Sequence, residues 1–189
     1  AKEEYKPRGL IQMSNVEAVC TTNDPIDDLK YHELLEKEDF KVKVIPAFRP
    51  DRALYIEKED FNAYIKDLEK SSGVIINNFT DIKNALKERM EFFDRHGCKA
   101  SDQAFKYIPH NKASLEELDK IVERKLSGET ISLAEEEAYK TELITYLAKE
   151  YKDRNWAMEI HVGVIRNNSK LLFENLGADV GGDSQNDLN

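Results

Sequence analysis

Segments with strand character alternate with segments of helix character along most of this chain, and that order restricts the fold more than any other feature. Four short apolar runs predict strands, at residues 16–20, 41–45, 97–100 and 158–164. Amphipathic stretches with helical spacing separate these runs, at residues 60–68, 81–96 and, in two parts, 114–151. The alternation predicts an α/β protein in which about four parallel strands are covered by helices.

Local signals predict several element boundaries. Asp24 followed by Pro25 predicts a helix N-cap, and a short helix through Leu34 is expected next. Pro46 predicts the end of the second strand. Gly97 predicts a left-handed helix C-terminus. Two capping boxes predict the starts of two later helices, Ser114 with Glu117 and Ser132 with Glu135.

Each predicted strand is followed by polar residues of unusual composition. The four segments are Thr21–Asp24, Phe48–Asp51, Ser101–Gln103 and His161–Asn168. In parallel sheets, functional groups gather beyond the carboxyl ends of the strands, so these segments predict a binding face. Helix N-caps are the alternative explanation for any single Asp or Ser among them.

The last predicted strand carries a histidine. Met158, Ile160, Val162 and Val164 alternate and predict one apolar face, whereas Glu159, His161 and Gly163 share the other. This pattern fits part of a site, and it also fits a surface strand with a polar outer face.

Composition excludes several classes of protein. The net charge of −9, with basic residues scattered among acidic ones, disfavours a nucleic-acid partner. No apolar run is long enough for a membrane span, and residues 1–5 lack the apolar core of a signal peptide. Cys20 and Cys98 have no metal or redox spacing and are expected to be reduced thiols. A cytoplasmic protein without a membrane partner is therefore expected.

The polar segments together resemble one family, the uronate (glucuronate) isomerases of the amidohydrolase superfamily. The resemblance extends over nearly the whole chain and rests on these motifs in the family's order: Thr21–Asp27, Phe48–Asp51, His96–Asp102, His161–Asn168, and Leu176–Asp179 with Gly181–Asp183. Arg8–Met13 and Gly128–Thr130 fit it as well.

The resemblance implies a (β/α) TIM barrel that binds a divalent metal, zinc being expected, through a His-x-His pair and an Asp on other strands. This chain has no His-x-His, so none of its residues is predicted to complete a metal site. The match indicates an internal fragment, residues 1–189 being a partial barrel that lacks the rest of its strands. Residues 113–152 exceed one barrel helix and predict a helical insertion. Four strands cannot close a barrel, so the open edges predict a marginal or edge-associating chain, and a homo-oligomer is possible.

The resemblance also implies an aldose–ketose isomerase of sugar acids, interconverting glucuronate with fructuronate or galacturonate with tagaturonate through an enediol. Arg49 is then expected to grip the uronate carboxylate, and His161 to hydrogen-bond a substrate oxygen or shuttle a proton. Asp102, Arg166 and Asn168 are further candidates for substrate binding. The isolated chain is expected to be inactive.

For each candidate a structural role stays open. Arg49 could pair only with Asp51, His161 could be a core histidine, Asp102 could cap a helix, and Arg166 and Asn168 could serve loop hydrogen bonding.

One position departs from the family. The family has Ser-Asp-His where this chain has Ser101-Asp102-Gln103, and glutamine cannot take up a proton at neutral pH. Two other functions compete with the isomerase: a non-catalytic helical interaction module, and part of a metal-dependent hydrolase.

Overall fold

The computed structural model describes residues 2–178 and 180–185. Asp179, which belongs to one motif of the predicted family, lies outside the described residues. The elements in chain order are η1 (Glu3–Tyr5), α1 (Pro7–Met13), β1 (Ala18–Asn23), α2 (Lys30–Glu36), β2 (Lys43–Phe48), α3 (Asp51–Leu54), α4 (Phe61–Ser72), α5 (Phe79–Arg95), β3 (Ala100–Phe105), α6 (Leu115–Leu126), α7 (Leu133–Asp153), β4 (Ala157–Val162), β5 (Val164–Ile165), α8 (Lys170–Leu176) and β6 (Ser184–Gln185).

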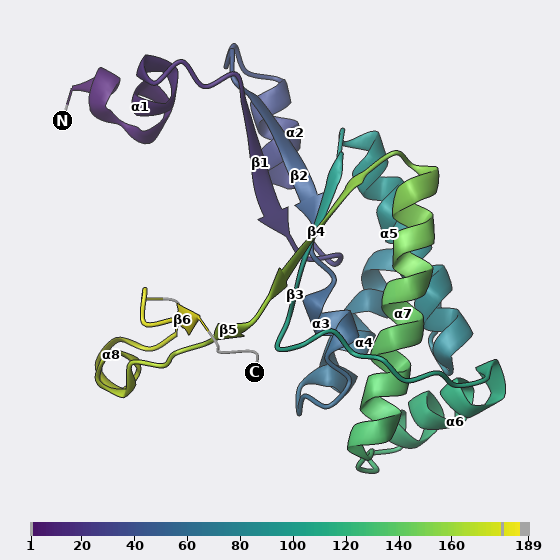
Figure 1. The fold of residues 1–189 in the computed structure, drawn as a ribbon. Coiled ribbons are helices and arrows are strands. Elements are labelled where there is room, and N and C mark those ends of the chain that lie inside the picture. Colours follow the sequence, from purple (N-terminus) through teal and green to yellow (C-terminus); the bar gives the residue numbers. More distant parts are fainter. Residues whose placement is uncertain (1, 179, 186–189) are drawn as a thin grey trace.

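The four longer strands form one parallel sheet in the order β1-β2-β3-β4. The predicted α/β class, with about four parallel strands of a partial barrel, is confirmed. The described sheet is open, with β1 and β4 at its edges (Figure 1). Because consecutive strands are neighbours joined by helices, all four carboxyl ends meet at one edge of the sheet.

The strand pairs differ in length. β1–β2 and β3–β4 each pair over six residues, but β2 and β3 pair only through Phe48 and Ser101. The sheet is therefore two well-paired ribbons joined at one position. Beyond that position, β3 runs on without a β2 neighbour.

The predicted end of β2 at Pro46 is wrong, because the strand continues to Phe48. The amides of Lys43 and Arg49 donate to Glu17 and Asn23, so the odd-numbered amides of β2 face β1. Pro46 stands between them, and its missing N–H would face β3. The single β2–β3 pair lies two residues later, so the proline removes no hydrogen bond from the sheet.

Three strands begin later than predicted. β1 covers residues 18–23 rather than 16–20, β2 begins at Lys43 rather than at residue 41, and β3 covers residues 100–105 rather than 97–100. Asp102 and Gln103 therefore lie within β3, and Asp102 is not a helix cap. The polar side chains of residues 101–103 suggested that β3 ends before them. Pairing with β4 and burial under the helices instead extend β3 through these residues.

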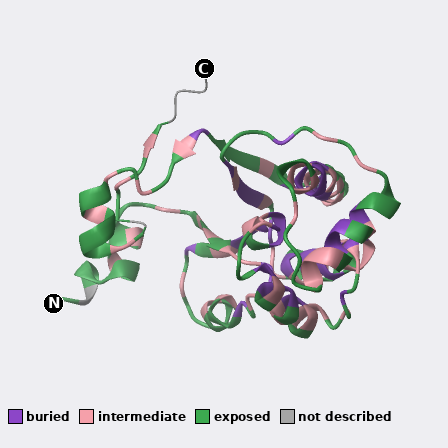
Figure 2. Cartoon of the chain, turned by 90° about the horizontal axis from the view of Figure 1, so that it is seen from below, coloured by how far each residue is buried: buried purple, intermediate pink, exposed green. Residues whose placement is uncertain are grey.

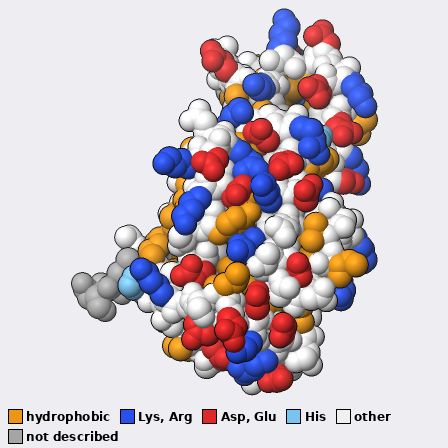
Figure 3. Space-filling view, turned by 90° about the vertical axis from the view of Figure 1, so that its right-hand side faces the viewer, with side chains coloured by type: hydrophobic (Ala, Val, Ile, Leu, Met, Phe, Trp, Pro, Cys, Tyr) orange, Lys and Arg blue, Asp and Glu red, His pale blue; other side chains and the backbone are white. Residues whose placement is uncertain are grey.

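Helices α4, α5 and α7 cover one side of the sheet, and the core lies beneath them (Figure 1). Phe48 of β2 is fully buried, with its ring centroid 5.1 Å from that of Phe93 on α5. Trp156 packs against the same group, with its ring centroid 6.1 Å from that of Phe48. Figure 3 views the helix side and shows acidic and basic side chains interspersed over it.

The helix signals vary in their outcome. Both capping boxes are present, and Gly97 has the expected positive φ of 80° after α5. The prediction that Asp24 caps a helix is wrong. Its Oδ1 accepts the amide of Ile26 at 3.1 Å and the hydroxyl of Tyr64 at 3.1 Å, forming a turn, and α2 starts only after Leu29.

Two segments lie away from this body. The segment η1–α1 and the excursion β5–α8–β6 contain few buried residues (Figure 2). The prediction of one strand through Val164 is wrong, since Gly163, with φ 77°, ends β4 and turns the chain. Ile160 and Val162 at the β4 edge are 43% and 36% exposed rather than covered.

The helices α6 and α7 form the connection from β3 to β4. That residues 113–152 are an insertion relative to a barrel stays a prediction. Within the described part of the chain, no helix has the length and apolar character that a membrane crossing requires.

Candidate active site

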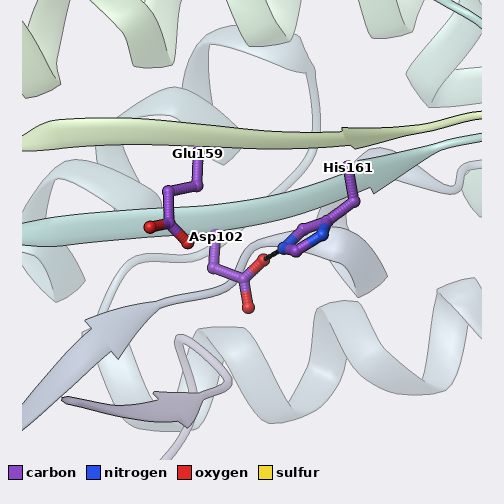
Figure 4. A group of neighbouring side chains, drawn as sticks. All are labelled: Asp102, Glu159 and His161. Carbon is purple, nitrogen blue, oxygen red and sulfur yellow. Dashed lines mark ion pairs between the residues drawn. The ribbon is translucent and has the colours of Figure 1, made fainter. Parts of the chain in front are cut away.

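Strands β3 and β4 place charged side chains on the sheet face opposite the helices. Asp102 pairs with Glu159 and Ala104 with His161 in the register of the two strands, so all four residues share one face. Figure 4 shows Glu159 and His161 extending from β4 toward Asp102 on β3. The alternate residues of β3 and β4 point to the helix side of the sheet. The polar cluster therefore lies on the face opposite the helices.

Asp102 and His161 form a close ion pair. The distance from His161 Nε2 to Asp102 Oδ1 is 2.6 Å. The contact is not aligned as a hydrogen bond, and Oδ1 receives no other donor from the described residues. The Asp102 side chain is only 10% exposed, whereas that of His161 is 50% exposed. The buried carboxylate thus holds an imidazole whose other side is open to solvent.

Arg49 approaches the same carboxylate from the end of β2. Its Nη1 lies 3.3 Å from Asp102 Oδ2, and its Nε donates to Asp51 Oδ2 at 2.8 Å. Thr22 of β1 also donates to Asp102 Oδ2, at 3.2 Å. Asp102 is therefore the residue at which groups from all four strands or their ends meet.

Burial opposes the charge of Arg49, but the hydrogen bond with Asp51 and the charges of Asp51 and Asp102 outweigh it. The net effect raises the pKa of the guanidinium. Arg49 consequently stays charged at any physiological pH and can bind an anion.

A cavity of about 880 Å³ opens at this edge of the sheet, with Arg49, His161 and Arg166 among its lining residues. Arg49 and His161, which belong to two segments of the predicted binding face, therefore line the same cavity. Arg49 pairs with Asp51, as its structural alternative expects, and it also reaches Asp102.

The remaining candidates lie farther along the chain. Arg166 lines the cavity, but its Nη1 donates to Asp183 Oδ2 at 2.7 Å, and Asn167 gives Asp183 a backbone hydrogen bond. The Asn167 amide first, and then Arg166, lower the pKa of Asp183. Asn168 is not among the cavity residues and donates to Ser184, which is the loop hydrogen bonding that the sequence left open.

Gln103 lies on the other face of β3. Asp102 and Gln103 are consecutive in a strand, so their side chains point to opposite sides of the sheet. Gln103 is fully buried and donates from Nε2 to the backbone oxygen of Glu159. The residue that departs from the family pattern is therefore not part of the Asp102–His161 cluster.

Several residues of this region were not predicted. Thr22 donates a hydrogen bond to Asp102. Lys140 of α7 is a buried residue that lines the cavity, and its ammonium pairs with Glu57 at 2.9 Å. Thr22 could have been found by extending the strand alternation from Cys20 across position 22. No local motif marks Lys140, which looks like any other charged residue of an amphipathic helix.

Asp102, Glu159 and His161 could each offer one ligand atom to a cation, and these atoms lie within 4.8 Å of one another. The donor types suit a divalent metal. The arrangement does not, because ligand atoms around a tetrahedral zinc stand roughly 3.3 Å apart, and Asp102 and His161 are in direct contact at 2.6 Å. The guanidinium of Arg49 beside Asp102 further opposes a cation. The pair must separate before an ion can bind there.

Comparisons with known proteins identify the family of this chain. Residues 1–189 match the family model described as glucuronate isomerase. The chain belongs to the glucuronate isomerase family. It is 42% identical over its whole length to a uronate isomerase of Caldanaerobacter subterraneus, of which it covers 41%, and 44% identical over 98% of its length to one of Lachnoclostridium phytofermentans, of which it covers 40%.

A solved structure supports the fold. The crystal structure of a uronate isomerase from Thermotoga maritima matches 98% of this chain with a TM-score of 0.90 at 30% identity, and the chain covers 41% of that protein. The chain thus spans about two fifths of the length of these relatives. The matches do not favour the interaction module or the hydrolase.

Proposed function

We propose that this chain forms part of an aldose–ketose isomerase acting on uronates, such as glucuronate and fructuronate or galacturonate and tagaturonate. The observation that carries the proposal is that Arg49 and His161 line one cavity and both contact the buried carboxylate of Asp102. A fixed cation and an imidazole held by a buried carboxylate are the groups that a sugar-acid isomerisation needs.

Arg49 binds the carboxylate of the sugar acid. Asp51 and Asp102 engage Nε and Nη1, and Nη2 makes no hydrogen bond with any of the residues that the structure describes. Nη2 and the second N–H of Nη1 therefore remain available to carboxylate oxygens of the substrate. This grip fixes the register of a flexible substrate in the cavity.

His161 acts on the reacting end of the sugar. The reaction moves a proton from a hydroxyl-bearing carbon to the neighbouring carbonyl carbon through an enediol, and the hydroxyl proton passes to the former carbonyl oxygen. His161, half exposed beside Asp102, hydrogen-bonds one of these oxygens or carries the proton. Asp102, whose Oδ1 lies 2.6 Å from Nε2, holds the ring in place.

The family resemblance implies a divalent metal, zinc, in the complete enzyme, which would supply Lewis-acid chemistry when bound. We place its ligands on strands that this chain does not contain. The steps assigned to Arg49 and His161 do not depend on the Asp102–Glu159–His161 group binding an ion.

We further propose a cytoplasmic protein whose remaining strands close a TIM barrel against the open edges of β1 and β4. Parallel edge strands expose unpaired amides and carbonyls, and the exposed Ile160 and Val162 lie at one of these edges. The 189-residue chain alone should therefore associate or unfold readily. Size-exclusion chromatography that shows a stable monomer would contradict this, and a homo-oligomer of the complete enzyme is a separate outcome.

The test of function uses a complete uronate isomerase that carries this chain as its segment. Glucuronate should become a ketose of unchanged mass, since no water is consumed. Arg49→Ala should lower kcat/KM at least a hundredfold while circular dichroism stays unchanged. Arg95→Ala, an exposed arginine outside the cavity, is the matched control. Normal turnover of Arg49→Ala would contradict the proposal.

A further inference from the structure

The gap between β2 and β3 is filled by side chains rather than by strand pairing. After the single pair Phe48–Ser101, β2 turns into α3, and β3 continues to Phe105. The peptide groups of Ala104 bond instead to side chains of this turn: Asp51 Oδ1 accepts the Ala104 amide at 3.0 Å, and the Tyr55 hydroxyl donates to the Ala104 carbonyl. Two side chains thus replace the missing neighbour strand.

The Asp51 carboxylate has a second bond. Its other oxygen, Oδ2, accepts Arg49 Nε at 2.8 Å. One carboxylate therefore ties the arginine to β3, the strand that carries Asp102 and lies beside His161. Its side chain is 17% exposed, so water competes little for either oxygen.

These two bonds determine which nitrogen atoms of Arg49 remain for a ligand. A guanidinium offers one donor at Nε and two at each terminal nitrogen. Nε is occupied by Asp51 and Nη1 reaches Asp102, whereas Nη2 makes no hydrogen bond with the residues that the structure describes. Without Asp51, rotation about the side chain would present other edges, and the anion site would lose its fixed direction.

We propose that Asp51 is a positioning residue that holds the guanidinium of Arg49 in register with β3, so that Nη2 and the second N–H of Nη1 stay available to the carboxylate of a substrate in the cavity that His161 also lines. This rests on the proposed uronate function. Asp51 lines the cavity, and its proposed effect on substrate binding acts through Arg49. Tyr55 shares the hydrogen bonding of Ala104 but makes no hydrogen bond with Arg49 among the described residues, which allows the two roles of Asp51 to be separated.

The experiment compares Asp51→Asn, Tyr55→Phe and Asp60→Asn in the complete enzyme with glucuronate as substrate. Asparagine keeps one acceptor oxygen but places an NH2 group at the second position, so it cannot satisfy both Ala104 and Arg49 Nε. Asp51→Asn should raise KM about tenfold with kcat within about threefold, as expected for a lost hydrogen bond to a charged group. Tyr55→Phe should raise KM less than threefold. Asp60→Asn, which changes an exposed partner of Arg52, should leave both kcat and KM unchanged.

A double-mutant cycle sharpens the result. In an Arg49→Lys background, which lacks Nε as a guanidinium donor, Asp51→Asn should add no further rise in KM. The inference would be overturned if Asp51→Asn and Tyr55→Phe raised KM equally, or if Asp51→Asn had an undiminished effect in the Arg49→Lys background. Asp51 would then serve only to hold β3 in place.

Two further outcomes are distinguishable. If Asp51→Asn does not fold, Asp51→Glu carries the test: the longer arm keeps the charge but displaces Arg49, so an unchanged KM would overturn the inference. If Arg49→Ala itself leaves kcat/KM unchanged, the proposed function fails. If Arg49→Ala is impaired and Asp51→Asn is normal, only the inference about Asp51 fails.

Discussion

The two faces of the sheet follow different physical rules. On the helix side, Phe48, Gln103 and Phe105 are at most 5% exposed and lie under the helix layer. On the open side, Asp102 is buried only because Arg49, Thr22 and His161 surround its carboxylate. One face is held by apolar packing, and the other by charges that compensate one another. We expect substitutions on the first face to change stability and substitutions on the second to change chemistry.

The largest expected effect is on the helix side. Phe48→Ala should lower the free energy of unfolding by about 3–5 kcal/mol, because a fully buried ring is removed from the core. Phe173→Ala, a ring 48% exposed on α8, is the control and should change it by less than about 1 kcal/mol. Urea unfolding followed by circular dichroism measures both. Similar losses for the two would mean that the core does not lie where the structure has it.

On the open face, His161→Ala should reduce kcat of the complete enzyme by roughly 10²- to 10⁴-fold, the range of general acid–base catalysis. Its side chain is 50% exposed, so the unfolding midpoint should barely move. His110→Ala tests an exposed histidine outside the cavity and should leave kcat unaltered. If stability rather than kcat responds to His161→Ala, the division between the faces does not hold at this residue.

Gln103→His restores the family residue but on the buried side. The larger ring and the lost bond to the Glu159 carbonyl should lower the free energy of unfolding by about 1–2 kcal/mol. Turnover should change less than about threefold, because the side chain does not face Asp102. A rise in kcat of tenfold or more would show that position 103 takes part in the chemistry after all.

The smallest effect concerns Asp24, which ends β1 but turns toward Tyr64 of the helix layer. Burial raises the pKa of Asp24 above its ordinary 3.8, outweighing the hydrogen bonds with Ile26 and Tyr64. The folded state therefore binds the proton more tightly than the unfolded state, and stability declines as pH rises from 3.8 through the raised pKa. Asp24→Asn, which keeps the acceptor oxygen, should flatten this slope. Unfolding free energies measured for both proteins across this pH range provide the test, and parallel slopes would refute it.

Sequence reasoning succeeded where the signal is local. The starts of α6 and α7 follow from Ser114 and Ser132 with their glutamates, since a capping box involves only four consecutive residues. The parallel sheet follows from the alternation of elements. The convergence of Arg49, Asp102 and His161 follows from the common edge at which parallel strands end.

It failed where distant parts of the chain decide the outcome. The shift of β3 to residues 100–105 depends on its pairing with β4, more than fifty residues away. The opposite facing of Asp102 and Gln103 became visible only once that shift was known. The double role of Asp51 depends on how far β2 and β3 pair, which no spacing in the sequence reveals.

Pro46 helps to explain why the two ribbons share only one backbone pair. It bars a hydrogen bond toward β3 on one side of the Phe48–Ser101 pair, and α3 diverts the chain on the other. The two ribbons are thus joined by one backbone pair and by the side-chain bonds of Thr22, Arg49, Asp51 and Tyr55 to β3. A small change in the angle between β1–β2 and β3–β4 would change the distance from the Arg49 guanidinium to the His161 imidazole, so these few links govern how far apart the two cavity residues stand.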